Sequence, residues 1–426
     1  MTSKSTPIRL TPARRRTARR TRTVGFPSPI RSRLGLVCAG GGVTGAVYEI
    51  GALAAIEDRL DHGSLTDFDV FVGVSCGSYI TALLANGVTP GLLYRNVTRS
   101  SRSGTALDEL ALFRLNTGEI ASRLAAAPMT IFDAAWHFYR NRRETTLTDL
   151  VQSLGGLLPS GLFQNEGLET WMAKWFDHPD RTDDFRKLNR SLRIVAVELD
   201  TGETKAFGGP GTDHVPISKA VRASCTMPGL YRPVKIDGVE YIDGGVRKTA
   251  HISLALQERC GLIICVNPIV PLRLKSDRLP LKNGEQGTVS GRGLPSILDQ
   301  VFRVTLHSRM KYGITRYERE APDSDILVFE PKPEDLPRFM SNIMRTSGRV
   351  RIAEYAYQST MKTIDDDFER ISRIFARHGL KLRTAAPEGH ESIRAARDLA
   401  SDVGEMTSSR LAASLRVLER NLADTA

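Results

Sequence analysis

Apolar and polar positions along the first third of the chain predict alternating strands and helices. The segments 34–39 and 67–74 are short apolar runs that end in or next to glycine, which is typical of buried strands. The segments 46–60 and 78–86 carry apolar residues at helical spacing. A strand, a glycine-rich loop, a helix, a second strand, a sharp turn and a second helix indicate an α/β fold with a mainly parallel sheet.

The rest of the chain extends this domain and then changes character. Residues 100–190 are predicted to be mostly helical, and shorter elements follow up to residue 270. The predicted strands are 192–199, 203–207, a hairpin over 234–242 that turns at Asp237-Gly238, and 261–266; the predicted helix is 217–224. We therefore divide the chain into a basic disordered arm (1–33), an α/β domain (34–270), a linker or loop rich in Gly, Pro and charge (271–295), and a mainly helical C-terminal region (296–426) with a strand at 325–329.

Some apolar residues between 100 and 190 stand outside the predicted sheet. Trp136, Trp171 and Trp175 fit core positions, with membrane anchoring as the alternative. The glycine-rich stretch 154–163 fits a loop that packs on the core. The alternatives for this stretch are contact with lipid or a lid over the site. The whole segment 100–190 is a candidate wall of a substrate cleft.

Positive charge is concentrated in the N-terminal arm. The chain has 426 residues and a formal net charge of +11. Ten of its 59 Lys and Arg residues lie in 1–33, which has no acidic residue, so the rest carries 49 basic and 48 acidic residues. A nearly neutral body does not indicate a nucleic-acid-binding protein. The arm is most simply a solvated tail; docking on anionic lipid and an organelle transit peptide are the alternatives.

Cysteine content and hydropathy indicate the cellular compartment in which the protein is expected. The five cysteines are odd in number and lack metal-type spacing, which argues against a disulfide framework or a zinc site and favours a reducing compartment. No run of 18 or more apolar residues is present, and the N-terminus lacks the apolar segment of a standard secretory signal. We expect a cytoplasmic protein, with peripheral membrane contact through the basic arm as a hypothesis.

The first candidate site is the glycine loop 40–45 (GGGVTG), which follows a predicted strand and opens a helix. It satisfies G-x-G-x-x-G, but Asp67 and Asp69 lie at the start of the second strand and not at its end, which disfavours a dinucleotide site. Backbone N–H groups at a helix N-terminus can instead face a developing negative charge. Three successive glycines exceed what a tight turn requires. The residues assigned to this oxyanion hole are Gly40, Gly41, Gly42 and Gly45.

The second candidate site is the segment 73–77 (GVSCG), which matches G-x-S-x-G. Gly73 and Gly77 permit a strained strand-to-helix turn that presents the hydroxyl of Ser75. A strand is predicted before this turn and a helix after it, as a nucleophile elbow requires. Ser75 is therefore the candidate nucleophile, and Cys76 is expected to pack as a small apolar residue.

The base that accepts the Ser75 proton has two kinds of candidate. Histidine is the usual one, and His251 and His307 follow plausible acids in chain order, although neither has a distinctive setting. Asp243 ends a predicted hairpin strand, and the two glycines after it leave room for a substrate. Asp-Gly is also a common turn sequence. The residue pattern alone leaves both kinds open.

Together these segments resemble the patatin-like phospholipase family. Segments 40–45, 73–77 and 243–245 follow the order of the family's G-G-G-x-x-G, G-x-S-x-G and D-G-G/A motifs, and 223–234 resembles its stretch of small residues, a proline and an aromatic before the aspartate. The resemblance covers about 34–268. It implies a three-layer α/β/α fold and a Ser75–Asp243 dyad in which Asp243 accepts the proton. It further implies that the glycine loop holds the oxyanion and that an acyl-enzyme forms without metal or cofactor.

The resemblance implies a lipid acyl hydrolase, either a phospholipase or an esterase, whose partner is its lipid substrate. The rival readings are a Ser-His-Asp hydrolase of soluble esters and a catalytically inactive lipid-binding protein. Two positions depart from the family pattern. Thr44 stands where many members have Arg or Lys, with an expected effect on head-group preference, and Cys76 stands where alanine commonly follows the nucleophile.

Overall fold

The computed structural model describes residues 26–27, 29–98, 114–140, 157–273, 279–280, 286–333 and 348–385. Within these residues the centre is an eight-stranded sheet of order β13-β10-β1-β2-β5-β9-β8, with β6 also paired to β5. The strands from β13 to β5 run parallel, and β6, β8 and β9 add antiparallel pairings. Their bounds are β1 (Ile30–Cys38), β2 (Val70–Val74), β5 (Ser191–Glu198), β6 (Thr204–Phe207), β8 (Val234–Ile236), β9 (Val239–Asp243), β10 (Cys260–Val266) and β13 (Asp325–Phe329).

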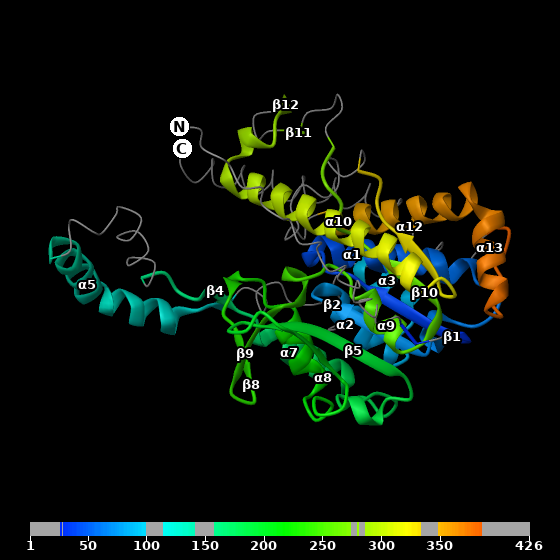
Figure 1. The fold of residues 1–426 in the computed structure, drawn as a ribbon, viewed down its shortest axis with the longest axis horizontal. Helices are drawn as coiled ribbons and strands as arrows, with labels where there is room; N and C mark the ends of the chain where they lie inside the picture. The colour runs from blue at the N-terminus through cyan, green and yellow to red at the C-terminus, as the bar shows by residue number, and fades with distance from the viewer. Residues whose placement is uncertain are drawn as a thin grey trace, which may run out of the picture.

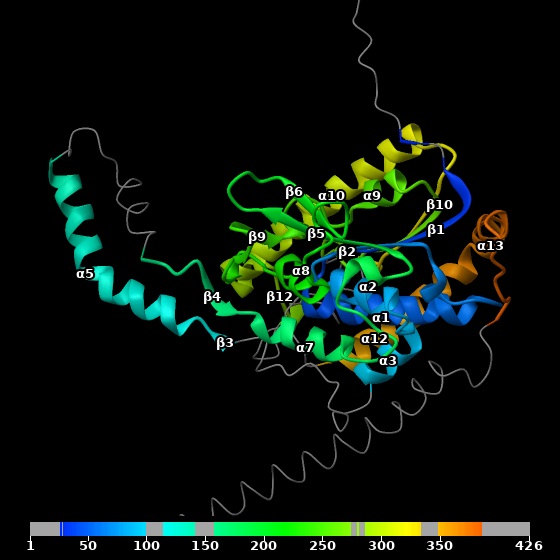
Figure 2. The same cartoon turned by 90° about the horizontal axis from the view of Figure 1, so that it is seen from below.

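Helices cover both faces of this sheet (Figures 1 and 2). Alternate residues at the end of β1 serve two cores: Leu36 and Cys38 pack with the first helical layer, and Val37 and the next residue but one, Ala39, just after the strand, pack with the second. Burial on both faces explains why the strands are apolar without interruption. The first layer holds α1 (Gly42–Arg59), α2 (Cys76–Ala85), α3 (Pro90–Thr98), α7 (Glu166–Phe176), α8 (Ile217–Ser224), α12 (Arg349–Asp366) and α13 (Phe368–Arg377), and the second holds α9 (Ile252–Gln257) and α10 (Leu294–Glu320). This is the predicted three-layer α/β/α architecture.

The C-terminal segments belong to the same hydrophobic core as the motifs. Helix α12 lies so close to α1 that a Cβ on Gly51 would stand 2.3 Å from the carbonyl oxygen of Ala353. The hydroxyl of Tyr357 on α12 donates a buried 2.8 Å hydrogen bond to Asp58 on α1. Strand β13 pairs with β10 at the edge of the central sheet. The region beyond residue 296 therefore contributes both a strand and a helical layer to the main body.

The predicted elements occur close to their predicted positions. The helix 217–224 and the strand 325–329 coincide with α8 and β13, and the β8–β9 hairpin turns at Asp237-Gly238. Strand β1 begins at Ile30, four residues earlier than predicted, so it overlaps the predicted arm. Strand β2 begins at Val70 because Ser64 caps a 3-10 turn, η1 (Leu65–Asp67), just before it. The arm residues 1–25 lie outside the described residues.

Between the elbow and Asp243 the chain makes a long excursion from the sheet. Helix α5 (Thr117–Arg140) extends away from the body in both views (Figures 1 and 2). A small sheet ties its base to the main domain, and it consists of β3 (Arg114–Leu115), β4 (Gly161–Gln164) and β7 (Gly229–Tyr231). Trp171 and Trp175 pack against the core, as predicted. The prediction for Trp136 is wrong: it is 54% exposed, because α5 stands clear of the core.

The remaining described elements are short. They are the 3-10 turns η2 (Phe185–Lys187), η3 (Gly244–Val246) and η4 (Ser290–Arg292), and the hairpin β11 (Leu279–Pro280) and β12 (Gln286–Gly287). Among the helices that the structure describes, none has the length and hydropathy that crossing a membrane would require.

Candidate active site

Strand β5 brings the predicted nucleophile and the predicted base together. Val74, the last residue of β2, pairs with Val195 of β5, and Asp243, the last residue of β9, pairs with Ala196. Strand β6 pairs with 194–197 and so occupies the other edge of β5. Strands β2 and β9 therefore follow one another along a single edge. Ser75 directly follows β2, so it meets Asp243 although 168 positions separate them in the sequence.

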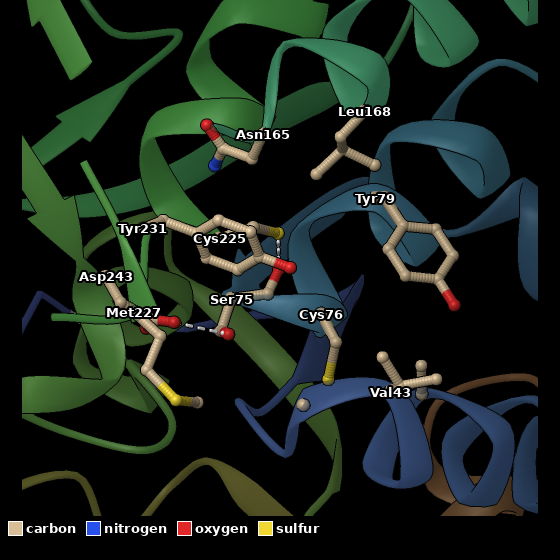
Figure 3. Close-up of a pocket in the computed structure, with 12 residues that line it drawn as sticks. Val43, Ser75, Cys76, Tyr79, Asn165, Leu168, Cys225, Met227, Tyr231 and Asp243 are labelled. Carbon is tan, nitrogen blue, oxygen red and sulfur yellow. Dashed lines mark hydrogen bonds between the residues drawn. The ribbon is translucent and has the colours of Figure 1, made fainter. Parts of the chain in front are cut away.

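The side chains of Ser75 and Asp243 form a buried, directly hydrogen-bonded pair (Figure 3). The hydroxyl of Ser75 donates to Oδ2 of Asp243 at 2.6 Å, and the two residues are only 6% and 5% exposed. The other carboxylate oxygen, Oδ1, accepts the N–H of Gly245 at 2.7 Å. Burial raises the pKa of Asp243 from 3.8 to about 6, against the opposing effect of these two hydrogen bonds. This carboxylate is a stronger base than an ordinary aspartate and is still ionised at neutral pH.

The elbow holds Ser75 in a strained backbone conformation. Its φ of 51° is in the left-handed region, which costs a non-glycine residue roughly 1–3 kcal/mol. Ser224 supports it: its Oγ accepts the N–H of Ser75 at 2.9 Å and donates to the carbonyl oxygen of Val195 at 2.6 Å. Ser224 thus bridges β5 and the residue that leaves β2. Its position in the segment 223–234 was noted in the sequence, but no local pattern indicated this role.

Both elbow glycines are required by close packing. A Cβ on Gly73 would lie 2.2 Å from Oγ1 of Thr81, and a Cβ on Gly77 would lie 2.4 Å from the carbonyl oxygen of Cys38. Neither of these neighbours can retreat, because Thr81 is fully buried in α2 and Cys38 is in the central strand β1. Larger residues at the two positions would displace the turn that presents Ser75.

The glycine loop lies against the nucleophile, and its four assigned glycines differ in what their N–H groups do. A Cβ on Gly40 would stand 3.2 Å from Cβ of Ser75. The N–H of Gly40 donates to the carbonyl oxygen of Thr249, and that of Gly45 donates to the carbonyl oxygen of Gly41, which precedes α1. The N–H groups of Gly41 and Gly42, at the start of α1, make no hydrogen bond within the described part of the chain. These two amides are therefore available to a bound group, while Gly40 and Gly45 permit close packing.

Two cavities meet at the Ser75–Asp243 pair. The smaller has a volume of about 80 Å³, and the larger, about 720 Å³, lies along the first half of α10; Met227 and Asp243 line both. Figure 3 shows the smaller cavity around Ser75. The segment 100–190, predicted as a wall of a substrate cleft, contributes Asn165 and Leu168 to the smaller cavity, whereas the wall on α10 was not predicted. The smaller is bounded among others by Val43, Tyr79, Leu168, Cys225 and Tyr231, and the larger by Pro295, Leu298, Val301, Phe302 and Thr305.

The histidines of the rival triad occupy other places. Neither His251 nor His307 hydrogen-bonds to Ser75 within the described residues. His251 is buried and bonds to the backbone of Gly244, and its burial lowers its pKa to about 3, so it is neutral. His307 on α10 faces Glu330, with Nε2 and Oε2 3.4 Å apart. Among the described residues no group of three or more His, Cys, Asp or Glu side chains is placed to hold a metal ion.

A sequence model described as patatin-like phospholipase matches residues 36–256, which contain the glycine loop, the elbow and Asp243. The chain belongs to the patatin-like phospholipase family. In this patatin-like chain, Thr44 and Cys76, the two departures from the family pattern, are both buried. Thr44 is fully buried and lines neither cavity, and its effect on head-group preference stays a prediction. Cys76 lines the smaller cavity beside Ser75 and is 5% exposed.

Several known proteins are similar to this patatin-like chain. The probable lipid hydrolase 463L of Invertebrate iridescent virus 6 is 22% identical over 52% of this chain and 63% of its own length. The uncharacterized protein YqhO of Bacillus subtilis is 25% identical over 54% of this chain and 69% of its own length. Among solved structures, VipD from Legionella pneumophila has a TM-score of 0.36 at 15% identity, covering 79% of this chain and 68% of VipD. Human GIVD cytosolic phospholipase A2 has a TM-score of 0.33 at 10% identity, covering 82% and 60%.

Proposed function

We propose that the protein hydrolyses carboxylic esters of lipids, glycerophospholipids foremost, with Ser75 as the nucleophile and Asp243 as its proton acceptor. The observation that carries this proposal is the 2.6 Å hydrogen bond from Ser75 Oγ to a buried carboxylate whose pKa is about 6. Membership of the patatin-like phospholipase family supports a lipid as the substrate. The name of the viral relative, probable lipid hydrolase 463L, points the same way.

The reaction would proceed through an acyl-enzyme. Asp243 Oδ2 accepts the hydroxyl proton while Ser75 Oγ bonds to the ester carbonyl carbon, which becomes tetrahedral and carries its charge on the former carbonyl oxygen. Cleavage of the ester C–O bond then releases the alcohol portion, which takes the proton from Asp243. A water molecule next gives a proton to Asp243 and attacks the acyl carbon. The Ser75 oxygen leaves with that proton, and the fatty acid is released.

Backbone amides would stabilise the tetrahedral oxygen. The N–H groups of Gly41 and Gly42 lie at the N-terminus of α1, and Cys76 is the first residue of α2, so two helix N-termini meet at the site. Donors of this kind typically contribute about 10²–10³ in kcat each. Behind them lies Glu49, whose pKa burial raises well above its usual value. Burial thus favours the uncharged form of this carboxyl group, which does not oppose the oxyanion.

The two cavities suggest how a lipid ester would fit. A cavity of about 80 Å³ has room for the ester group and its first carbons, since each water molecule in the liquid occupies about 30 Å³. The cavity of about 720 Å³ is in the range of about 300–1,000 Å³ that is typical of whole small-molecule sites. Its walls on α10 include Leu298 and Val301, which are 57% and 55% exposed. We therefore place the acyl chain along the first half of α10.

Replacing Val301 with tryptophan should selectively impair long-chain esters. The larger ring would fill part of the α10 cavity, and each methylene that loses its burial costs about 0.8 kcal/mol. We expect kcat/KM for a nitrophenyl palmitate to fall about 10–100-fold, with that for a nitrophenyl butyrate within twofold of wild type. Val304→Trp is the matched control, because Val304 is exposed on the same helix but does not line the cavity. Equal losses on both esters would contradict the placement of the chain.

The proposed function is tested by determining which bond of a phospholipid is hydrolysed. Phosphatidylcholine vesicles are incubated with the full chain in water enriched in oxygen-18, and the products are analysed by mass spectrometry. We expect free fatty acid with one oxygen-18 in its carboxyl group, together with an unlabelled lysophospholipid. Label on phosphate would indicate a phosphodiesterase. Absence of any product from phosphatidylcholine and from nitrophenyl butyrate would favour the inactive lipid-binding protein.

A further inference from the structure

Helix α5 separates its polar and apolar side chains onto opposite faces. At about 100° per residue, the polar side chains described from Glu119 onward fall within an arc of about 100°. The large apolar side chains lie across roughly the opposite half of the helix. The polar set is Glu119, Ser122, Arg123, Thr130, Asp133 and Arg140, and the apolar set, named here the α5 apolar face, is Leu124, Met129, Ile131, Phe132, Trp136 and Tyr139.

The α5 apolar face is open to solvent. Its six side chains are between 50% and 69% exposed. Three of them form one aromatic cluster: the ring centroids of Phe132 and Trp136 are 6.4 Å apart, and those of Trp136 and Tyr139 are 6.1 Å apart. A helix of a globular protein ordinarily turns such a face towards the core. An exposed apolar surface of this extent marks a site of interaction.

Contacts at the base of α5 turn its polar face, and not its apolar face, towards the returning chain. The carboxylate of Glu119 accepts hydrogen bonds from the N–H and the hydroxyl of Ser160, at 2.9 and 2.8 Å. It also accepts the side-chain amide of Asn116 at 2.7 Å. These hydrogen bonds lower the pKa of Glu119 to about 2 against a desolvation effect that would raise it, so the carboxylate stays ionised at neutral pH. The apolar face is therefore held outward.

Exposed apolar side chains also occur at the base of α5, where the small sheet joins the rim of the active site. Leu115 in β3 and Leu162 in β4, at the two ends of the excursion, are 58% and 48% exposed. Strand β4 pairs with β7, where Phe163 is opposite Tyr231. Tyr231 and Asn165, the residue after β4, line the smaller cavity next to Ser75. The small sheet at the base of α5 thus connects this helix to the walls of the Ser75–Asp243 site.

We propose that α5 docks the protein on a lipid surface, with its apolar face in the boundary between head groups and acyl chains. An amphipathic helix with Trp, Phe and Leu on one face lies in this boundary at a depth of about 5–10 Å. The polar face carries Glu119 and Asp133 against Arg123 and Arg140, so its charges balance and a zwitterionic surface suffices. This proposal rests on the proposed function in one respect: the lipid surface on which α5 docks is also the source of the substrate. The stretch 154–163, predicted to be packed on the core, contributes Leu158, which is 71% exposed.

The test compares a double variant, Phe132→Ser with Trp136→Ser, with a matched double variant, Val304→Ser with Tyr312→Ser. The second pair removes exposed apolar side chains from α10. Binding of the full chain to phosphatidylcholine vesicles is measured by flotation, and nitrophenyl butyrate hydrolysis reports the active site. We expect the α5 pair to weaken vesicle partitioning at least about 30-fold and the α10 pair to change it less than threefold. Both should keep butyrate hydrolysis within twofold of wild type.

Salt and footprinting complete the test. Raising NaCl from 0.1 to 0.5 M should change partitioning less than twofold, because the docking face carries no net charge. Hydroxyl-radical footprinting should oxidise Met129 and Trp136 in the vesicle-free monomer and spare them when vesicles are added.

Unchanged partitioning of the α5 double variant would overturn the proposal. So would a dimer that this variant abolishes, or protection of Met129 and Trp136 already in the monomer. A wild-type chain that binds vesicles but hydrolyses no ester would refute the proposed function and leave the docking intact.

Discussion

Ser75→Ala is expected to lower kcat/KM at least about 10³-fold on both nitrophenyl butyrate and phosphatidylcholine. The methyl group cannot bond to the carbonyl carbon, so no acyl-enzyme forms. Only the backbone donors and substrate binding then remain to accelerate attack by water. The effect is measured as initial rates with folded protein, and circular dichroism verifies the fold. A fluorophosphonate should label wild type stoichiometrically and the variant not at all.

Two histidine variants accompany Ser75→Ala. His307→Gln should stay within about threefold of wild type, because His307 faces Glu330 and not Ser75. His251→Asn should lose at most about tenfold, since His251 bonds to the backbone of Gly244 next to Asp243. An inactive histidine variant together with an active Asp243→Asn would overturn the two-residue mechanism in favour of a Ser-His-Asp triad.

Asp243→Asn is expected to lower kcat about 10²–10⁴-fold while it stabilises the fold at neutral pH. The amide cannot accept the proton of Ser75. The stability gain follows from the raised pKa: moving it from 3.8 to about 6 corresponds to about 3 kcal/mol by which the fold disfavours the charged carboxylate. The amide has the same shape and no charge. Its free energy of unfolding at pH 7.5 should therefore exceed that of wild type by up to about 3 kcal/mol.

The pH dependence makes this prediction specific. Because the folded state raises the pKa of Asp243, the native chain binds the extra proton, and this contribution to stability is complete below about pH 3.8. It is lost as pH rises through about 6. The stability difference between Asp243→Asn and wild type should thus be large at pH 7.5 and vanish near pH 4, as urea unfolding can show. The wild-type kcat/KM should rise with pH around pH 6. A variant less stable than wild type at pH 7.5 would contradict the assigned burial effect.

Most strands and helices, and both Ser75 and Asp243, could be predicted from the sequence. Each is accompanied by a local pattern of apolar residues, glycines or turn residues. Apolar runs that end in glycine gave β1 and β2, and the Asp237-Gly238 turn gave the β8–β9 hairpin. Glycines that cannot be replaced by a larger residue without a clash, such as Gly73 and Gly77, can be recognised in the sequence as parts of motifs. The cytoplasmic location and the lipid contact of the arm 1–33 stay predictions.

Features that depend on distant partners were not predictable in the same way. The hydroxyl of Ser224 bridges Ser75 and Val195 only after β5 has paired, and one sequence does not specify which edge a strand will use. The wall formed by Leu298 and Val301 lies outside every motif. Trp136 was expected in the core because aromatic residues are usually buried, and only the position of α5 reveals otherwise.

Ser75 and Asp243 are both positioned by strand β5. The geometry of the reacting atoms therefore depends on β5 and its neighbours, and not on the excursion that carries α5. The excursion that carries α5 leaves after α3 and returns at β4, whereas Val195, Ala196 and Ser224 set the spacing of the reacting atoms. Insertions, deletions and new sequences in the excursion can accumulate without moving Ser75 Oγ relative to Asp243 Oδ2. A lineage built on this frame can therefore acquire a new surface preference there while it inherits its chemistry unchanged.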